Sequence, residues 1–157
     1  MVARGNLGRD NPLSKFAVDT NILLYAEGLG GAPSDMSKVD QAKAVLRKVA
    51  EIEGPPLVIP VQVLAEFYHV LVRKSGCSAA EAAGIVRKWQ APSKVVGSDE
   101  RVFEHALRLA ERHRVPVYDA LILNSVAGHA EILLSEDFQD GFVWRGVTVR
   151  NPFSQPI

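Results

Sequence analysis

The sequence predicts a single α/β domain in which a parallel sheet carries helices on both faces. Two observations lead to this fold class: short apolar runs alternate with segments of helical periodicity, and acidic residues recur where a run passes into a helix. The 157 residues suit one domain around one core. We expect residues 15–153 to form this domain and residues 1–14, which are polar and contain several Gly and Asn, to form a flexible N-terminal arm.

Composition narrows the classes of protein to which the chain can belong. No apolar run approaches the ~20 residues of a membrane span, and the first residues lack the apolar core of a secretory signal. Eighteen basic and eighteen acidic residues cancel, so any contact with nucleic acid must be local. The lone Cys77 cannot form an intrachain disulfide, and the four histidines lack the spacing of a zinc site. We therefore expect a cytoplasmic protein without zinc or membrane association.

The first element, residues 16–26, is an apolar run that meets an acid and continues as a helix. Asp19 follows the expected strand directly, and parallel α/β sheets bind ligands outside the carboxyl ends of their strands. The alternative role of Asp19 is to cap the following helix through a side-chain oxygen. Taken alone, Asp19 is more simply a cap, so a functional site requires further acids at equivalent junctions.

The next elements follow from turn residues and helical spacing. Ser37 with Asp40 resembles a capping box and predicts a helix that ends at residues 54–56, a Gly-Pro-Pro sequence. A brief buried strand over residues 57–59 should follow.

Residues 61–74 predict a helix that is apolar on two sides, with Leu64 on one side and Phe67 on the other. The narrow polar strip between these sides consists of Gln62, Glu66, His69 and Arg73. Such a strip is by default a solvated face. Because this helix follows directly on a strand, however, Glu66 could instead line the crevice that Asp19 faces.

The middle of the chain, residues 78–113, contains helix and strand signals but no residues that we predict to be functional. Residues 78–81 form a capping box that opens another helix, and residues 94–96 form a short strand. The helix expected over residues 99–113 has an acidic first turn and a basic end, as the helix dipole favours. We assign no role to His105 or His113 in this helix.

The last third of the chain repeats the opening pattern of strand, acid and helix. Asp119 follows the apolar run 115–118 and begins a helix, and Asp137 follows the strand expected at residues 131–134. A final strand is expected over residues 142–150. Three aspartates and Glu66 should therefore meet at the carboxyl edge of the sheet.

Four carboxylates at one edge predict a bound metal ion. Carboxylates that crowd together repel one another and raise one another's pKa, so a folded protein neutralises them. Mg²⁺ or Mn²⁺ is the simplest neutralising ion because these hard cations take oxygen ligands and join carboxylates to a phosphate substrate. This chemistry points to phosphoryl transfer or hydrolysis.

The motifs also resemble those of a known family. V-D-T-N-I-L-L-Y, a glutamate within V-L-A-E-F-Y-H-V-L, Y-D-A-L-I and L-L-S-E-D-F-Q-D-G occur in this order between Phe16 and Pro152. Together they closely resemble the PIN-domain nucleases, particularly the bacterial VapC-type toxins. The resemblance implies a three-layer α/β/α sandwich with a short parallel sheet, a homodimer, cleavage of single-stranded RNA, and inhibition by a small antitoxin protein.

The resemblance also implies roles for individual residues. The acids that hold Mg²⁺ or Mn²⁺ and carry catalysis would be Asp19, Glu66, Asp119 and Asp137. Thr20, Asn21 and Ser135 match the positions that orient those acids. Asp137 matches the fourth ligand, with Asp140 as the alternative and Glu136 beside it.

Three further questions stay open at this point. Arg73, and with it Lys74, could contact the RNA backbone, although a solvated arginine is the simpler interpretation. A phosphatase of the haloacid-dehalogenase type also begins with a strand and an aspartate, but it needs a second aspartate where Asn21 stands. A non-catalytic PIN-like scaffold that binds RNA or protein is the alternative function, although a scaffold has no reason to keep all four acids.

Overall fold

A computed structural model describes residues 14–30, 32–52 and 54–157 of the chain. The predicted arm lies outside the described residues except for Ser14, which is the first residue of strand β1 (Ser14–Val18). Ser14 pairs with Ala130, and its backbone N–H donates to the carbonyl oxygen of His129 at 3.0 Å. The domain therefore begins one residue before the predicted boundary at residue 15, and its first strand begins two residues before the predicted start at residue 16.

The described part of the chain contains one six-stranded sheet in the order β3-β2-β1-β4-β6-β5. The other strands are β2 (Val58–Pro60), β3 (Lys94–Val96), β4 (Ala130–Leu134), β5 (Val143–Trp144) and β6 (Val147–Arg150). All neighbouring pairs are parallel except β5 with β6. The carboxyl ends of β1 and β4 therefore lie side by side at one edge.

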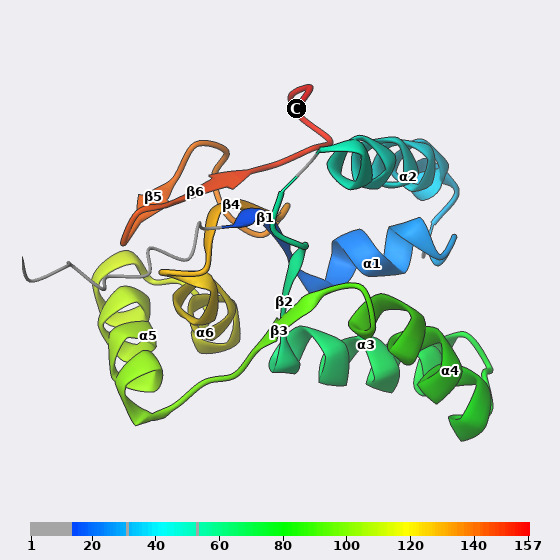
Figure 1. The fold of residues 1–157 in the computed structure, drawn as a ribbon, viewed down its shortest axis with the longest axis horizontal. Coiled ribbons are helices and arrows are strands. Elements are labelled where there is room, and N and C mark those ends of the chain that lie inside the picture. The colour runs from blue at the N-terminus through cyan, green and yellow to red at the C-terminus, as the bar shows by residue number, and fades with distance from the viewer. Residues whose placement is uncertain (1–13, 31, 53) are drawn as a thin grey trace, which may run out of the picture.

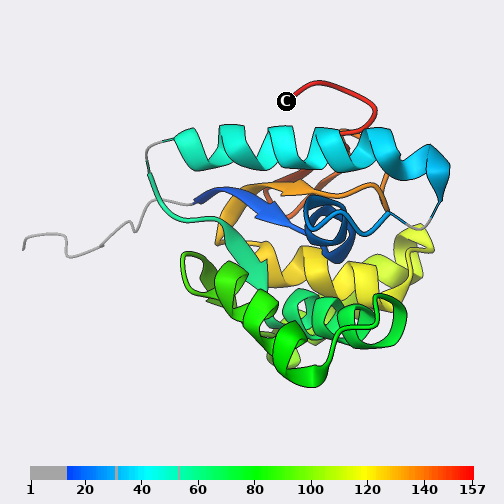
Figure 2. The same cartoon turned by 90° about the vertical axis from the view of Figure 1, so that its right-hand side faces the viewer.

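Helices cover both faces of the sheet. They are α1 (Thr20–Ala26), α2 (Met36–Glu51), α3 (Val61–Lys74), α4 (Ala79–Gln90), α5 (Glu100–His113) and α6 (Val117–Val126). Figure 2 shows α2 above the sheet and α3, α4 and α6 below it, and α5 lies beside α6 in Figure 1. The predicted three-layer α/β/α class is thus confirmed. Among the described residues, no helix has the length and apolar character that spanning a membrane requires.

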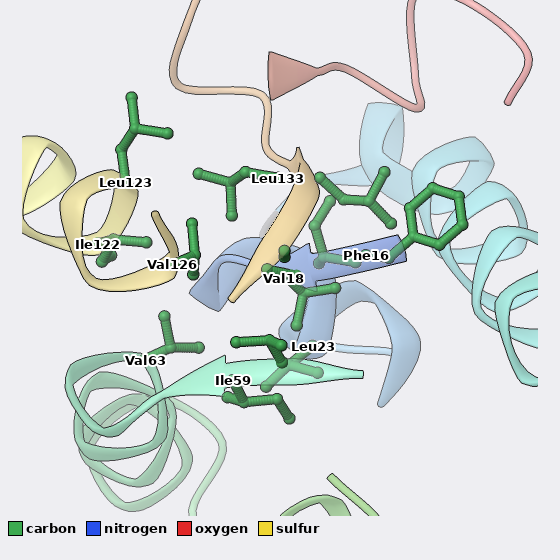
Figure 3. Packing of buried hydrophobic residues seen from close by; sticks show 14 of the residues in the cluster. Phe16, Val18, Leu23, Ile59, Val63, Ile122, Leu123, Val126 and Leu133 are labelled. Carbon is green, nitrogen blue, oxygen red and sulfur yellow. The ribbon is translucent and has the colours of Figure 1, made fainter. Parts of the chain in front are cut away.

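The core lies where the central strands meet these helices (Figure 3). Val18, Ile59 and Leu133 come from three neighbouring strands and are fully buried. Leu23 of α1 and Leu123 of α6 pack around them. Central strands are buried on both sides in a parallel sheet, which explains why they appear in the sequence as short continuous apolar runs.

Several elements match the predictions closely. α3 and β3 have the predicted bounds, and the predicted capping box opens α4. In that box, Ser78 Oγ accepts from the N–H of Glu81 at 3.2 Å, and the Glu81 carboxylate accepts from the N–H of Ser78 at 2.8 Å. These features depend on residues that are close in the sequence.

The prediction that α3 is apolar on two sides is wrong. Its buried residues lie on a single face and are Val63, Leu64, Phe67 and Leu71. Val61 and Tyr68 are 51% and 37% exposed. A helix that packs on one side of a sheet meets the core with one face only, so the remaining apolar side chains stay on the surface.

The predicted capping box at Ser37 is also wrong. A 3₁₀ turn, η1 (Pro33–Asp35), precedes α2, and Ser37 lies inside the helix. Asp35 Oδ2 accepts from the backbone N–H of Ala32 at 3.0 Å. Proline fixes its own φ and so favours the start of the turn here, and α2 itself has no side-chain hydrogen bond at its N-cap, Asp35.

The predicted single strand over residues 142–150 is instead the hairpin of β5 and β6. Arg145 and Gly146 form its two-residue turn with φ angles of 48° and 81°. Positive φ at both turn residues suits the twist of an antiparallel hairpin, and Gly146 adopts it without steric cost.

The predicted strand at residues 115–118 is absent from the described structure. α6 begins at Val117, directly after Pro116, and Asp119 lies in its first turn. Proline is compatible with a helix start because its missing N–H has no partner there. Asp119 therefore reaches the sheet edge from a helix and not from the end of a strand.

Candidate active site

A cleft of about 550 Å³ lies at the carboxyl edge of β1 and β4. The four predicted acids Asp19, Glu66, Asp119 and Asp137 all line it. They come from the end of β1, from α3, from the first turn of α6 and from the loop after β4. The fold therefore brings together side chains that are up to 118 positions apart in the sequence, from 19 to 137.

Asp19 is both a helix cap and a part of this cleft. Its Oδ1 accepts from the N–H of Ile22 at 3.4 Å, which caps α1, and its Oδ2 accepts from the hydroxyl of Ser135. The residue is 3% exposed. Burial raises the pKa of Asp19 well above its usual range, the Ser135 hydrogen bond opposes this shift, and the charge of Asp137 adds to it. The two roles predicted as alternatives are thus compatible.

Ser135 connects two of the acids. Its side chain is buried, and its Oγ donates to Asp19 while accepting from the backbone N–H of Asp137 at 3.1 Å. This geometry supports the orienting role expected for Ser135. Asn21, which was expected to act similarly, lines the cleft.

Glu66 is held from two sides. Thr20 Oγ1 donates to Glu66 Oε2 at 2.8 Å, as expected for an orienting residue, and Gln62 Nε2 donates to Glu66 Oε1 at 2.8 Å. Gln62 Nε2 also donates to the carbonyl oxygen of Tyr118 at 3.3 Å and so links α3 to the first turn of α6. Gln62 was assigned no role from the sequence, although it precedes Glu66 by four residues, a spacing that places both side chains on one face of a helix.

Asp119 shows that the carboxylates influence one another. Burial raises its pKa to about 6, with further contributions from the charges of Asp137 and Glu66. Within the described residues, no hydrogen bond opposes this shift. Asp119, like Asp19, is therefore harder to ionise than a solvated aspartate, as expected for a carboxylate that is partly buried near other carboxylates.

The two other acids near Asp137 face away from the cleft. Asp140 Oδ1 accepts from Arg150 Nε at 3.2 Å and from the N–H of Asn151 at 2.8 Å. Glu136 forms an ion pair with Lys38, in which Lys38 Nζ lies 2.7 Å from Glu136 Oε2. Of the three acids that follow β4, the cleft is lined by Asp137.

The basic residue at the cleft differs from the first choice made from the sequence. Lys74 lines the cleft together with His69, and Arg73 does not. Glu66, Val70 and Lys74 recur every four residues and form one ridge of α3, and the cleft follows this ridge. The interpretation of Arg73 as a solvated residue is therefore favoured.

The residues of the cleft fit a hard divalent cation. Their ligand atoms are carboxylate oxygens, which Mg²⁺ and Mn²⁺ prefer, and the cleft has room for waters. Among the described residues, however, no three acids are grouped closely enough to form a ready ligand set. The expectation of four tightly packed carboxylates is thus corrected to four acids around one cleft. This spacing suits Mg²⁺, which keeps several waters and uses one or two carboxylates.

Comparisons with known proteins agree with this architecture. Residues 16–139 match the family model of the PIN domain. No curated protein sequence matches the chain significantly.

Solved structures share the fold at low sequence identity. A toxin-antitoxin complex from Klebsiella pneumoniae has a TM-score of 0.62 and 19% identity, over 88% of this chain and 98% of that chain. Mycobacterium tuberculosis VapC20, a sarcin-ricin loop cleaving toxin, has a TM-score of 0.58 and 17% identity, over 76% and 87%. VapBC2 from Rickettsia felis, bound to a promoter DNA fragment, has a TM-score of 0.56 and 16% identity, over 76% and 86%.

Proposed function

The chain belongs to the PIN-domain family, and from this premise we propose that it is a Mg²⁺- or Mn²⁺-dependent endoribonuclease that cleaves single-stranded RNA. One observation carries the proposal: Asp19, Glu66, Asp119 and Asp137 line a single cleft at the carboxyl edge of the sheet. In open α/β sheets this edge is where ligands bind.

The chain's own residues would prepare the cleft for this reaction. Thr20 and Ser135 fix the directions in which the carboxylates of Glu66 and Asp19 point. Asp119 is half-buried and has no opposing hydrogen bond within the described residues, so it is free to turn toward a cation. When bound, the divalent cation would activate a water and offset the charge on the phosphate.

Cleavage of a randomised single-stranded RNA pool tests this proposal. We expect cleavage in Mn²⁺ and none in excess EDTA, because the carboxylates attract substrate phosphates only through a cation. The same pool as DNA, or annealed into duplex, provides the control for substrate class. If the pool stays intact and the protein shows no saturable binding of Mn²⁺, the non-catalytic scaffold replaces the nuclease.

Lys74 is proposed as a contact to the RNA backbone, because it lies on the cleft ridge two turns from Glu66. Replacing Lys74 with Ala should weaken RNA binding and flatten its salt dependence, since one phosphate contact changes the slope of log K against log salt by about 0.9 or less. Arg73→Ala is the matched control, with a similar charge one residue away but outside the cleft. Binding is measured by fluorescence anisotropy from low to high salt in EDTA. Equal slopes for Lys74→Ala and wild type would contradict this assignment.

We also propose that the protein is a cytoplasmic homodimer and the toxin of a type II pair with a small antitoxin. Apolar side chains beside the cleft support the dimer: Val61 is 51%, Tyr68 37% and Tyr118 68% exposed. The hydrogen bond from Gln62 to Tyr118 places these α3 and α6 residues near one another. Exposed apolar patches of this kind favour contact with another protein surface. The fold shared with VapC structures supports the toxin assignment.

A further inference from the structure

We propose that Tyr25, Lys38 and Glu136 form a positioning network that fixes Asp137 for cation binding. The inference rests on the proposed metal-dependent function and deepens it. None of the three side chains lines the cleft, so they would act through the chain segment that carries Asp137. We call these three residues the Glu136 network.

The Glu136 carboxylate is held at both of its oxygens. Lys38 Nζ of α2 donates to Oε2 at 2.7 Å, and the hydroxyl of Tyr25 at the end of α1 donates to Oε1 at 3.0 Å. The side chains of Lys38 and Glu136 are 32% and 17% exposed, so this pair is less solvated than the exposed Lys15–Glu131 pair. The network thereby attaches the loop after β4 to both α1 and α2.

Aromatic packing restrains the same side chains. The Lys38 ammonium lies 5.4 Å from the ring centroid of Tyr25 and 5.5 Å from that of Phe153, within the range of cation–π attraction. The Tyr25 and Phe153 rings meet edge to face at 5.3 Å. The hydrogen bond with Glu136 raises the pKa of Lys38, so the ammonium stays charged. Few alternative positions are therefore open to the Glu136 carboxylate.

Glu136 lies between Ser135, which bonds to a residue of the cleft, and Asp137, which lines the cleft. On one side, Ser135 bonds to the Asp19 carboxylate and to the N–H of Asp137. On the other side, Asp137 has an exposed side chain that packing does not hold. The position of the Asp137 carboxylate therefore depends on the backbone of residues 135–137. Ser135 holds this segment beside the cleft through its hydrogen bond to Asp19, and Glu136 holds it against α1 and α2 through its bonds to Tyr25 and Lys38. Loss of the hydrogen bonds to Glu136 should therefore increase the mobility of the backbone at Asp137.

The variants separate positioning from simple charge effects. Tyr25→Phe removes one hydrogen bond and changes no charge. Lys38→Met leaves the Glu136 carboxylate unpaired, and by charge alone this would strengthen cation binding. If the Glu136 network positions Asp137, cation binding should instead weaken in both variants, because residues that hold a metal ligand in place raise the affinity for the metal.

The experiment is a Mn²⁺ titration of the full chain, followed by electron paramagnetic resonance of the free ion. We expect Kd to rise by about tenfold in Tyr25→Phe and Lys38→Met, the lower end of outer-shell effects. Lys38→Arg should recover part of the affinity. Lys15→Met, which breaks an exposed ion pair outside the cleft, is the control and should leave Kd unchanged. A Kd within twofold of wild type in Tyr25→Phe, or a lower Kd than wild type in Lys38→Met, would overturn the proposal that this network positions Asp137.

Amide hydrogen exchange provides a second readout that needs no metal. The N–H of Asp137 donates to Ser135, so its exchange reports whether this segment is held. We expect faster exchange at Asp137 in Tyr25→Phe while the central residues of β4 keep their protection. If wild type binds no Mn²⁺, the proposed function fails, and Asp137 exchange alone then decides the network. Unchanged exchange in both variants would refute it, and so would a uniform increase across β4, which indicates global destabilisation.

Discussion

Replacing Asp119 with Asn is expected to lower the rate of RNA cleavage by about 10²- to 10³-fold, the usual scale for removing one electrostatic contact of an active site. Asn keeps the shape of the side chain and removes the charge that attracts the cation. Asp119 is the most informative of the four acids to change, because Asp19 also caps α1 and Glu66 accepts two hydrogen bonds. The measurement is the initial rate on single-stranded RNA at saturating Mn²⁺, with circular dichroism to verify the fold.

Asp99→Asn is the matched control for this variant. Asp99 also lies at a helix start, where its Oδ1 accepts from the N–H of Val102 at 2.9 Å, but it is outside the cleft. Asn caps helices about as well as Asp, so this variant should cleave RNA and melt like wild type. Unchanged cleavage by Asp119→Asn would show that Asp119 holds no cation that matters for the reaction.

Mn²⁺ is expected to raise the melting temperature strongly at pH 7.5 and weakly at pH 5.5. A ligand that binds only the folded state stabilises it by about 2.7 kcal/mol at a hundredfold excess over Kd. For a domain of this size that free energy corresponds to roughly 5–10 °C. Protons compete with the cation for carboxylates, so the gain shrinks as pH falls. Differential scanning fluorimetry at both pH values measures it.

Without metal, the same carboxylates should make the fold more stable as pH falls from 7.5 toward 5. The pKa of Asp119 is about 6 in the folded state, against about 4 for a solvated aspartate. Folding therefore disfavours its ionised form. This destabilisation is fully present above about pH 6 and is lost progressively as pH falls from about 6 toward about 4, the pKa in the unfolded chain. Burial lowers the pKa of His129 and of His105, so the folded state disfavours their protonated forms. Protonating these two residues as pH falls therefore lowers the stability of the fold, which is opposite to the effect of Asp119.

The comparison of wild type with Asp119→Asn isolates the contribution of the cleft. Both proteins contain the same histidines, so the difference between their melting temperatures in EDTA cancels the histidine effect. We expect Asp119→Asn to melt higher than wild type at pH 7.5 and to approach it at pH 5. It should also gain less from Mn²⁺. Parallel curves for the two proteins, in EDTA and in Mn²⁺, would contradict the shared site.

The sequence by itself determined the elements whose signals are local. The bounds of α3 and β3 and the capping box at Ser78 follow from side chains a few positions apart. The hairpin turn at Arg145 and Gly146 also had a local signal in the sequence, which is the glycine. The apolar residues on both sides of this turn led instead to the prediction of one continuous strand. The four acids could be named from motifs in the chain, and their convergence on one cleft agrees with that choice. The arm stays a prediction for residues 1–13, which lie outside the described residues, while Ser14 belongs to β1.

Only the tertiary structure decided which neighbouring side chains enter the cleft. Asp137 lines it while Asp140 and Glu136 bond elsewhere, and Lys74 lines it while Arg73 does not. The motif already favoured Asp137 over Asp140, but the choice of Arg73 over Lys74 was made from the sequence and differs from the structure. The partners that hold Asp140 and Glu136 away from the cleft are distant along the chain, so the sequence does not reveal them.

The hydrogen bonds of the site show how distant those partners are. Thr20 and Glu66 are 46 positions apart, Tyr25 and Glu136 are 111 apart, and Asp19 and Ser135 are 116 apart. Periodicity and turn chemistry act over one or two turns of chain. The direction of a side chain at the end of a strand is instead set by whichever donor packing brings beside it, so it is fixed only when the sheet and helices have assembled.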